Sequence, residues 1–294
     1  MDKVKKGKSK HKEDLQDTQN NADSRNIPIN RVGIKDIAYP ILITDKDKIT
    51  QNVVGNFVMS VSLPPEKKGT HMSRFVEVID KQKKAISVEN FEDLVKTTAK
   101  TLQSDTAFIS LDFTYFKNKS APVTGVKSLL DYKVNFSAES KNNRHNKFIT
   151  VTVPVTSLCP CSKNISDYGA HNQRSNISAT IRLKETIWID EIIEILENQA
   201  SCQIYGLLKR PDEKYVTEEA YNNPKFVEDM IRDLAITLNK DDRVLAYKIE
   251  SENFESIHNH SAYAYIEKDK TKDSYNKNNN VSFLKLSQLR SSCH

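Results

Sequence analysis

Two kinds of hydrophobic repeat alternate along this chain of 294 residues, and their order limits the folds that it can adopt. In residues 56–63 and 106–116, apolar side chains occupy every second position, which is the spacing of a β-strand with one buried face. Between them, in residues 89–102, apolar side chains such as Leu94 and Val95 follow a helical spacing instead. These patterns predict a strand, a helix and a strand in turn.

The second half of the chain repeats the scheme. Strands are predicted over 148–155 and 175–183, helices over 189–196 and 223–238, and closing strands over 244–251 and 261–268. Pro224 fits the first turn of the second of these helices. A doubled order of this kind is typical of an α+β fold with two related modules, antiparallel sheets and helices on one face. The predicted segments are a disordered basic N-terminal arm (1–27), a first module (28–140), a second module (141–267) and a polar C-terminal extension (268–294).

Charge and composition exclude several classes of protein. The first 12 residues carry six lysines and one aspartate, so they account for the whole net charge of +5 and leave the rest nearly neutral. A surface that coats nucleic acid is therefore not expected. No apolar run approaches the ~18–20 residues of a membrane helix, and no apolar segment of a signal peptide follows the basic start. Without a signal peptide, the four cysteines do not favour a disulfide framework, and a cytoplasmic protein is expected.

Residues 157–176 hold a cysteine pair and a histidine with the spacing of no common zinc finger or redox motif. Cys159 and Cys161 are one residue apart, and His171 follows 12 positions after the first. An open catalytic zinc site needs about three protein ligands and a water. Cys159, His171 and a carboxylate from elsewhere would supply them. The alternative is a buried thiol pair with a hydrogen-bonded surface histidine, and the spacing leaves both open.

Four further ionisable residues could belong to a site, and three of them have a simpler interpretation. Glu213 lies in a stretch, 207–221, that is too charged to be core. Glu228 flanks the apolar stripe of its helix, where an exposed pair with Arg232 four residues later is the simpler interpretation. Glu255 and His258 precede a strand, where they could move protons or belong to a polar loop.

The glycines constrain how this chain could bind phosphates. There are seven, all isolated, and neither GxxxxGK[ST] nor GxGxxG occurs. Any bound phosphate must therefore be held by side chains. Lys68, His71 and Arg74 surround a Gly-Thr turn, and they could hold an anion or simply begin a helix.

Five stretches of the sequence, in order, resemble the type IB GTP cyclohydrolases, the metal-dependent prokaryotic form. The resemblance runs from about residue 31 to 267 and is carried by VGIKDIAYPI, KGTHMSRFVE, PVTSLCPCSKNISDYGAHNQRS, LLKRPDEKYVTEEAYNNPKFVEDMIRD and ESIHNHSAYA. It implies the tunnelling fold (T-fold), with tandem ββαα modules whose antiparallel sheets form barrels in the oligomer. It also implies a homotetramer with active sites between subunits. The implied reaction converts GTP and water to 7,8-dihydroneopterin triphosphate and formate, the first step of tetrahydrofolate and pterin biosynthesis.

The resemblance also implies roles for individual residues. Cys159, His171 and Glu213 match the ligands of one divalent metal per active site, which zinc, manganese or iron(II) would suit. A metal-activated water is then expected to attack C8 of the guanine, the carbon lost as formate. Glu228 matches the residue that anchors the purine, because a carboxylate can accept two parallel hydrogen bonds from its N1–H and 2-amino groups.

The remaining matches concern catalysis and the triphosphate. His258 is expected to transfer protons at N7 or at the ribose oxygen, Glu255 to orient it, and Cys161 to donate a proton or a hydrogen bond. The triphosphate is expected to meet cationic side chains carried by the same motifs. These candidates are Lys68, His71, Arg74, Lys163, Arg174, Lys209 and Arg210.

Two other functions compete with the cyclohydrolase. A nitrile reductase of the same fold, acting on a deazapurine, would use an activated cysteine as covalent nucleophile and need no metal. A metal-stabilised module without enzymatic activity could use the basic arm to bind nucleic acid. The Cys159, His171 and Glu213 trio argues against the first, and the near-neutral charge outside the arm argues against the second.

Overall fold

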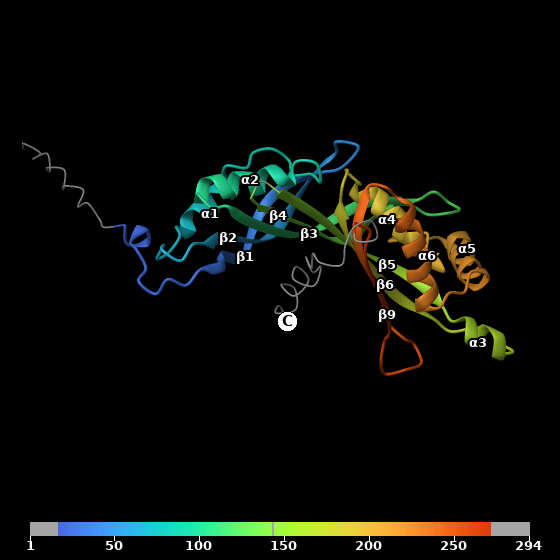
Figure 1. Ribbon diagram of the computed structural model, residues 1–294. Helices are drawn as coiled ribbons and strands as arrows, with labels where there is room; N and C mark the ends of the chain where they lie inside the picture. Colours follow the sequence, from blue (N-terminus) through green and yellow to red (C-terminus); the bar gives the residue numbers. More distant parts are fainter. Residues whose placement is uncertain (1–16, 143, 272–294) are drawn as a thin grey trace, which may run out of the picture.

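The structure is a computed structural model that describes residues 17–142 and 144–271 (Figure 1). Within these residues, a single antiparallel sheet of nine strands runs in the order β1-β2-β3-β4-β5-β6-β8-β9, with the short strand β7 paired to β5. The α+β class and the antiparallel pairing are therefore confirmed. The tandem ββαα modules and the barrels of the oligomer stay predictions.

Each half of the chain places helices between pairs of strands. The first half contains β1 Ile29–Thr44, β2 Thr50–Leu63, α1 Met72–Asp80, α2 Phe91–Leu102, β3 Thr106–Ser120 and β4 Lys127–Lys141. The second half adds two helices and a short strand to this order. It contains β5 Arg144–Leu158, α3 Pro160–Ile165, β6 Asn172–Leu183, α4 Ile189–Glu197, β7 Cys202–Gln203, α5 Arg210–Asn222, α6 Val227–Lys240, β8 Val244–Asn253 and β9 Ala262–Asp269.

The alternating apolar residues of the strands form one buried face. Phe57 and Met59 of β2 are fully buried, and they pair directly with Leu111 and Ile109 of β3. Because paired residues of antiparallel strands lie on the same face, the alternation continues from strand to strand across the sheet. The sequence pattern thus predicts both the strands and the face that they bury.

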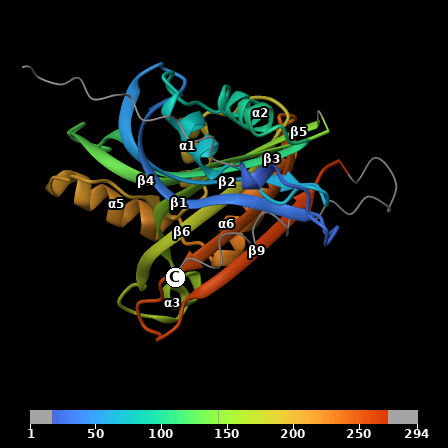
Figure 2. The ribbon, with the colours of Figure 1, turned by 90° about the vertical axis from the view of Figure 1, so that its left-hand side faces the viewer.

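The apolar stripes of α1, α2, α4 and α6 pack on that face and join it in one hydrophobic core that runs through both halves. Figure 2 shows α1 and α2 lying against the strands of the first half. One helix start was predicted wrongly: α6 begins at Val227, so Pro224 precedes it. Asp229 accepts the N–H of Phe226 at 3.0 Å and sets this start through a side-chain cap. In the described part of the chain, no helix combines the length and apolar character that a membrane span requires.

The sheet continues across the predicted boundary between the two modules. The boundary between the two modules falls where β4 turns into β5, yet these strands pair from Lys141 and Arg144 to Lys133 and Thr152. The boundaries therefore stay a prediction.

Both predicted tails extend beyond the described residues. Residues 1–16 of the arm and 272–294 of the extension lie outside them. Residues 19–23 of the arm, however, form backbone hydrogen bonds with residues 66–69. The expectation of disorder is therefore wrong for this part of the arm, because its backbone groups find partners that the polar composition did not reveal.

Buried polar contacts also join the two halves. Lys119 of β3 forms an ion pair with Glu197 at the end of α4, with Nζ and Oε1 2.6 Å apart, and the Tyr132 hydroxyl donates to the same oxygen at 2.9 Å. All three side chains are buried. Burial lowers the pKa of the Lys119 ammonium, and the Glu197 carboxylate opposes that shift. This cluster links β3 and β4 of the first half to a helix of the second.

Candidate active site

Cys159 and His171 lie next to each other where β5 ends and β6 begins. Leu158, the last residue of β5, pairs with Asn172, the first residue of β6. The Cys159 N–H donates to the His171 carbonyl at 3.1 Å, and the Ser162 N–H donates to Cys159 Sγ at 3.4 Å. The connection through the short helix α3 therefore makes neighbours of two residues that are 12 positions apart.

The His171 ring is held by a buried chain of polar side chains. Its Nδ1 lies 2.9 Å from Gln173 Oε1, and Gln173 Nε2 donates to Ser157 Oγ at 2.8 Å. Ser157 Oγ lies 2.8 Å from Ser175 Oγ. With the Gln173 amide nitrogen donating to Ser157 Oγ, its oxygen faces the ring, and a proton on His171 Nδ1 would complete that hydrogen bond and leave Nε2 with a lone pair. A neutral histidine in this tautomer is ready to bind a metal through Nε2.

The loop between β8 and β9, which carries two of the predicted catalytic residues, contacts His171. Ser256 Oγ lies 3.5 Å from His171 Nδ1. Glu255 is half-buried beside it, and His258 is exposed, with its ring stacked on His260 at a centroid distance of 5.1 Å. Ser256 thus places the loop that carries Glu255 and His258 against the His171 ring.

Helix α3 contributes two further candidates. Cys161 is exposed on this helix, two positions after Cys159. Lys163 Nζ lies 4.2 Å from the centre of the Tyr221 ring and donates to the Tyr221 carbonyl. Lys163 therefore ties α3 to the C-terminal turn of α5.

Glu228 is exposed in the first turn of α6. The N–H of Lys225, just before this helix, donates to the Leu158 carbonyl at 3.1 Å, so the start of α6 lies beside the strand end that precedes Cys159. Across residues 17–142 and 144–271, no ion pair joins Glu228 to Arg232. The surface-pair interpretation of Glu228 is therefore not observed.

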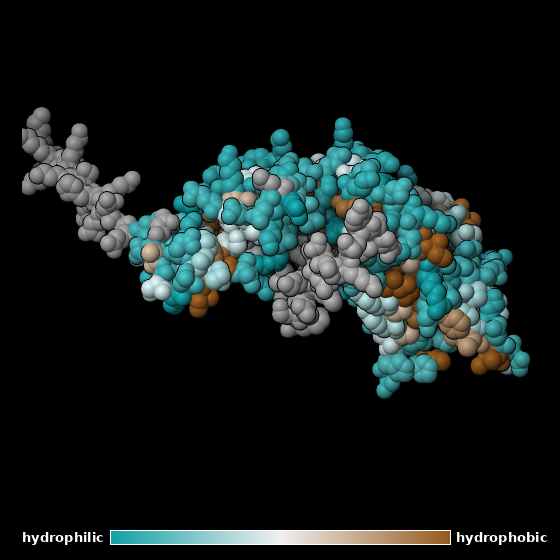
Figure 3. Space-filling view, in the orientation of Figure 1, coloured by the Kyte–Doolittle hydropathy of each residue, from teal (hydrophilic) through white to brown (hydrophobic). Residues whose placement is uncertain are grey.

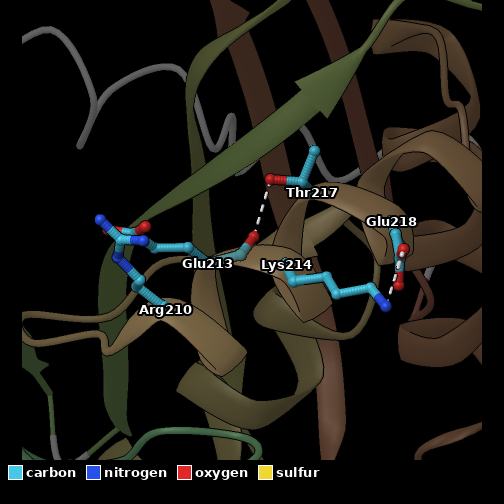
Figure 4. Close-up of a pocket in the computed structure, with 5 residues that line it drawn as sticks. All are labelled: Arg210, Glu213, Lys214, Thr217 and Glu218. Carbon is cyan, nitrogen blue, oxygen red and sulfur yellow. Dashed lines mark hydrogen bonds and ion pairs between the residues drawn. The ribbon is translucent and has the colours of Figure 1, made fainter.

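Glu213 is exposed in the first turn of α5. It lines an open depression of about 500 Å³ with Arg210 and Lys214 (Figure 4). Tyr221, which contacts α3, follows eight positions later, about 12 Å along the helix axis at 1.5 Å per residue. No group of three or more His, Cys, Asp or Glu side chains that could hold a metal occurs among the described residues. Within one chain, Cys159 and His171 come together but Glu213 does not join them.

The predicted phosphate-binding residues divide into two groups. The group in the second half consists of Lys163, Arg174, Lys209 and Arg210, and the group in the first half consists of Lys68, His71 and Arg74. His71 is the N-cap of α1, so the helix-start interpretation holds there, and its Nε2 lies 3.3 Å from Asp17 Oδ2. Figures 1 and 2 both show α1 far from α3, so the two groups do not meet in one chain.

Apolar side chains are exposed around the Cys159–His171 end of the molecule. Ile165 and Tyr168, at and after the end of α3, are 84% and 101% exposed, and Ile257 of the β8–β9 loop is 62% exposed. Figure 3 shows hydrophobic surface near α3, at the lower right. Exposed apolar patches of this kind are typical of contact surfaces.

Comparison with known families identifies the chain. The model of the family described as type I GTP cyclohydrolase folE2 matches residues 15–264. The chain belongs to this family. A GTP cyclohydrolase FolE2 of Nitrosomonas eutropha is 58% identical over 259 residues, covering 88% of this chain and 97% of the relative. A GTP cyclohydrolase FolE2 of Azoarcus sp. (strain BH72) is 56% identical over 257 residues, covering 87% and 96%.

Membership in the type I GTP cyclohydrolase family confirms the resemblance seen in the sequence. It decides between the three functions left open there in favour of the cyclohydrolase, a hydrolase, over the nitrile reductase and the nucleic-acid module.

Solved structures agree on the fold of this type I GTP cyclohydrolase. A hyper-thermostable uricase mutant has a TM-score of 0.54 at 7% identity, covering 90% of this chain and 98% of the uricase. The uricase of Arthrobacter globiformis has a TM-score of 0.50 at 8% identity, covering 88% and 97%. At these identities the similarity concerns the fold alone, and it supports a uricase-like tunnelling fold.

Sequence reasoning missed two buried polar residues that lie next to candidate site residues. Gln173 stands at an inward-facing position of the alternation that continues with Ile177 and Ala179, and a polar residue there was the available signal. Asp212 precedes Glu213 and is fully buried. Burial would raise the pKa of its carboxyl, but hydrogen bonds from Thr124 and from neighbouring backbone N–H groups hold that pKa well below its usual range. No local pattern signals these partners.

Proposed function

We propose that this enzyme hydrolyses GTP with water to 7,8-dihydroneopterin triphosphate and formate, the first step of tetrahydrofolate and pterin biosynthesis. The observation that carries the proposal is the juxtaposition of Cys159 and His171, with the His171 ring held by Gln173, in a chain of the GTP cyclohydrolase family. We extend the proposal to a cytoplasmic location.

Family membership implies a metal-dependent enzyme, and we propose one divalent ion per active site: zinc, manganese or iron(II). Its ligands are Cys159, His171 and Glu213. The first two fit such an ion, because Cys159 Sγ already accepts an N–H and the Nε2 lone pair of His171 is free. When bound, the ion supplies a water of pKa lowered towards ~7.

The third ligand comes from a neighbouring subunit. Among the described residues of one chain, Glu213 forms no metal-binding group with Cys159 and His171, and exposed apolar side chains surround that pair. Both observations support a homotetramer with active sites between subunits. We extend the proposal to the tandem ββαα modules of the T-fold, paired into barrels in the oligomer.

Replacing Gln173 by leucine should weaken zinc binding by about 10–100-fold. The reason is that His171 loses the acceptor that keeps the proton on Nδ1. Zinc affinity is measured by competition with a chromogenic chelator. Thr180→Val is the matched control, because it removes a hydrogen bond to Thr150 between the same two strands without touching His171. Equal zinc affinity in Gln173→Leu and the wild type would show that the ring needs no such partner.

Proton transfer is assigned to the residues around this pair. His258 moves protons at N7 of the guanine or at the ribose ring oxygen, since imidazole is the side chain that most often does so at neutral pH. Glu255 orients His258, and Cys161 donates a proton or a hydrogen bond. Their positions on the β8–β9 loop and on α3 support these roles.

Substrate binding follows from charge and position. Glu228 accepts two hydrogen bonds from the N1–H and 2-amino groups of guanine, and its exposure beside the end of β5 supports this. The triphosphate contacts cations of the second-half group, and Lys68, His71 and Arg74 reach it from a neighbouring subunit. Without a glycine loop, side chains must supply these contacts.

The proposal predicts that chelator-treated protein loses GTP turnover and regains it on addition of zinc, manganese or iron(II). Turnover is followed by formate release and by the fluorescence of the oxidised neopterin product. Full turnover by the stripped protein would exclude a metal-supplied nucleophile and make Cys161 the suspected one. Absence of turnover with every metal would contradict GTP as the substrate.

A further inference from the structure

Asp212 is a fully buried carboxylate in the first turn of α5, and it accepts four hydrogen bonds. One comes from the N–H of Lys209 at 2.9 Å and caps the helix start. The other three come from the turn between β3 and β4: the N–H groups of Val123 and Thr124, at 2.9 Å each, and the Thr124 hydroxyl at 2.6 Å. A carboxylate has about four lone-pair sites, so each acceptor position of Asp212 is used.

The start of β4 lies against the approach to α5 at a second point. A Cβ atom on Gly206 would lie 2.8 Å from the Leu129 carbonyl oxygen, at the start of β4. Such a distance is shorter than any side chain tolerates, so the segment before α5 lies tightly against the backbone of β4. The β3–β4 turn and the residues after it therefore hold the start of α5 through two independent contacts.

The first turn of α5 has no apolar anchor of its own, although further along the helix Val216 and Ala220 pack with Leu158 and Cys202. An amphipathic helix is normally held by a stripe of apolar side chains. The buried residues of α5 are Asp212 and Ala220, whereas α6 buries six side chains, all of them apolar. Asp212 is thus the buried side chain of the first turn of α5, and its hydrogen bonds hold that turn on the β3–β4 turn.

We infer that Asp212 is a positioning residue, which fixes the first turn of α5 on the β3–β4 turn and so orients Glu213 and Arg210 for the active site. Successive residues point about 100° apart around a helix. With Asp212 held inward, Glu213 is held outward in one direction, as a ligand offered to another subunit must be. The inference rests on the proposed role of Glu213 as a metal ligand.

Two variants weaken the contact between Asp212 and the β3–β4 turn, one by changing the acceptor and the other by changing a donor. Asp212→Asn keeps the shape of the side chain but turns an NH₂ group towards N–H donors, so at least one bond is lost. Thr124→Val removes the hydroxyl that donates to Asp212 and leaves the helix cap from Lys209 intact. We call the three hydrogen bonds from the β3–β4 turn to Asp212 the clamp. If the clamp orients the site, and not the helix cap from Lys209 alone, both variants affect the site.

Asp45→Asn is the matched control. Asp45 is also a buried carboxylate of the first half that holds the start of a second-half helix, since it accepts the N–H groups of Ile189 at 3.1 Å and Asp190 at 3.0 Å. That helix, α4, carries none of the predicted site residues. Asp45→Asn therefore makes the same chemical change as Asp212→Asn and should cost similar stability. It differs in that the helix held by Asp45 does not carry Glu213.

The experiment measures zinc affinity by chelator competition, kcat and KM for GTP, and hydrogen exchange of the amides of 123, 124 and 209–213 in the full-length protein. We expect Asp212→Asn to weaken zinc binding about tenfold or more and to speed exchange at these amides, with a smaller effect for Thr124→Val. Asp45→Asn should lower the melting temperature but leave zinc affinity and KM unchanged.

Two results would overturn the inference. One is unchanged zinc affinity in Asp212→Asn despite a lowered melting temperature, which would make the clamp purely structural. The other is an equal loss of zinc affinity in Asp45→Asn, which would indicate general loosening. If the wild type itself binds no zinc and turns over no GTP, the proposed function fails. In that case unchanged exchange at 209–213 in Asp212→Asn would still refute the clamp, and faster exchange would support it.

Discussion

Mixing two inactive variants, Cys159→Ala and Glu213→Ala, should restore GTP turnover, although neither variant is active alone. Each variant lacks one proposed metal ligand, and loss of an outer partner of a ligand already lowers activity by about 10–100-fold, so loss of a ligand should lower it further. If a site takes Cys159 from one subunit and Glu213 from another, mixed oligomers contain some sites with both residues. Random assortment of equal amounts in a symmetric oligomer leaves about a quarter of the sites intact.

The variants are co-expressed with different affinity tags, and doubly tagged oligomers are assayed for formate release. Cys159→Ala mixed with His171→Ala is the control, because these residues adjoin within one chain and a mixed oligomer repairs no site that uses both. That mixture should stay inactive. If the first mixture also stays inactive while mixed wild-type subunits are active, Glu213 serves its own chain or is no ligand.

The strands and the cysteine–histidine pair could be predicted from the sequence because they follow from short-range order. Alternation of apolar residues fixes which face of β2 is buried, and Phe57 and Met59 lie where it requires. Once β5 and β6 pair, Cys159 and His171 must meet, because they immediately follow and precede the paired ends. The same reasoning could have identified Gln173, a polar residue at an inward-facing position of β6.

Other features depend on contacts that no local pattern encodes. The start of α6 is set by the Asp229 side chain rather than by Pro224, and choosing between two such caps requires the packed helix. The partners of Asp212 lie 88 and 89 residues earlier in the chain. The position of Glu213 depends on where α5 docks, to which these distant contacts contribute. Motif matching names the residues of a site without saying which chain supplies them.

Replacing Glu197 by alanine should lower the free energy of unfolding by about 3–5 kcal/mol. The change leaves the buried Lys119 ammonium without its counter-charge and the Tyr132 hydroxyl without its acceptor. The Tyr205 ring, 4.6 Å from Lys119 Nζ, is a weak substitute for a carboxylate. Unfolding in urea is followed by fluorescence of the single tryptophan, Trp188, which caps the helix that ends at Glu197. Protomer concentration is held fixed, since assembly contributes to apparent stability.

Two further variants separate the charge from the hydrogen bond. Tyr132→Phe removes one donor and should lower the free energy of unfolding by only about 1 kcal/mol. The double variant Lys119→Met and Glu197→Met should recover most of the loss, because it removes both buried charges and fills similar volume with apolar atoms. A loss below about 1 kcal/mol in Glu197→Ala would match a solvent-exposed pair instead. It would mean that water reaches Lys119, and that the surrounding core does not exclude solvent from the ion pair between β3 and α4.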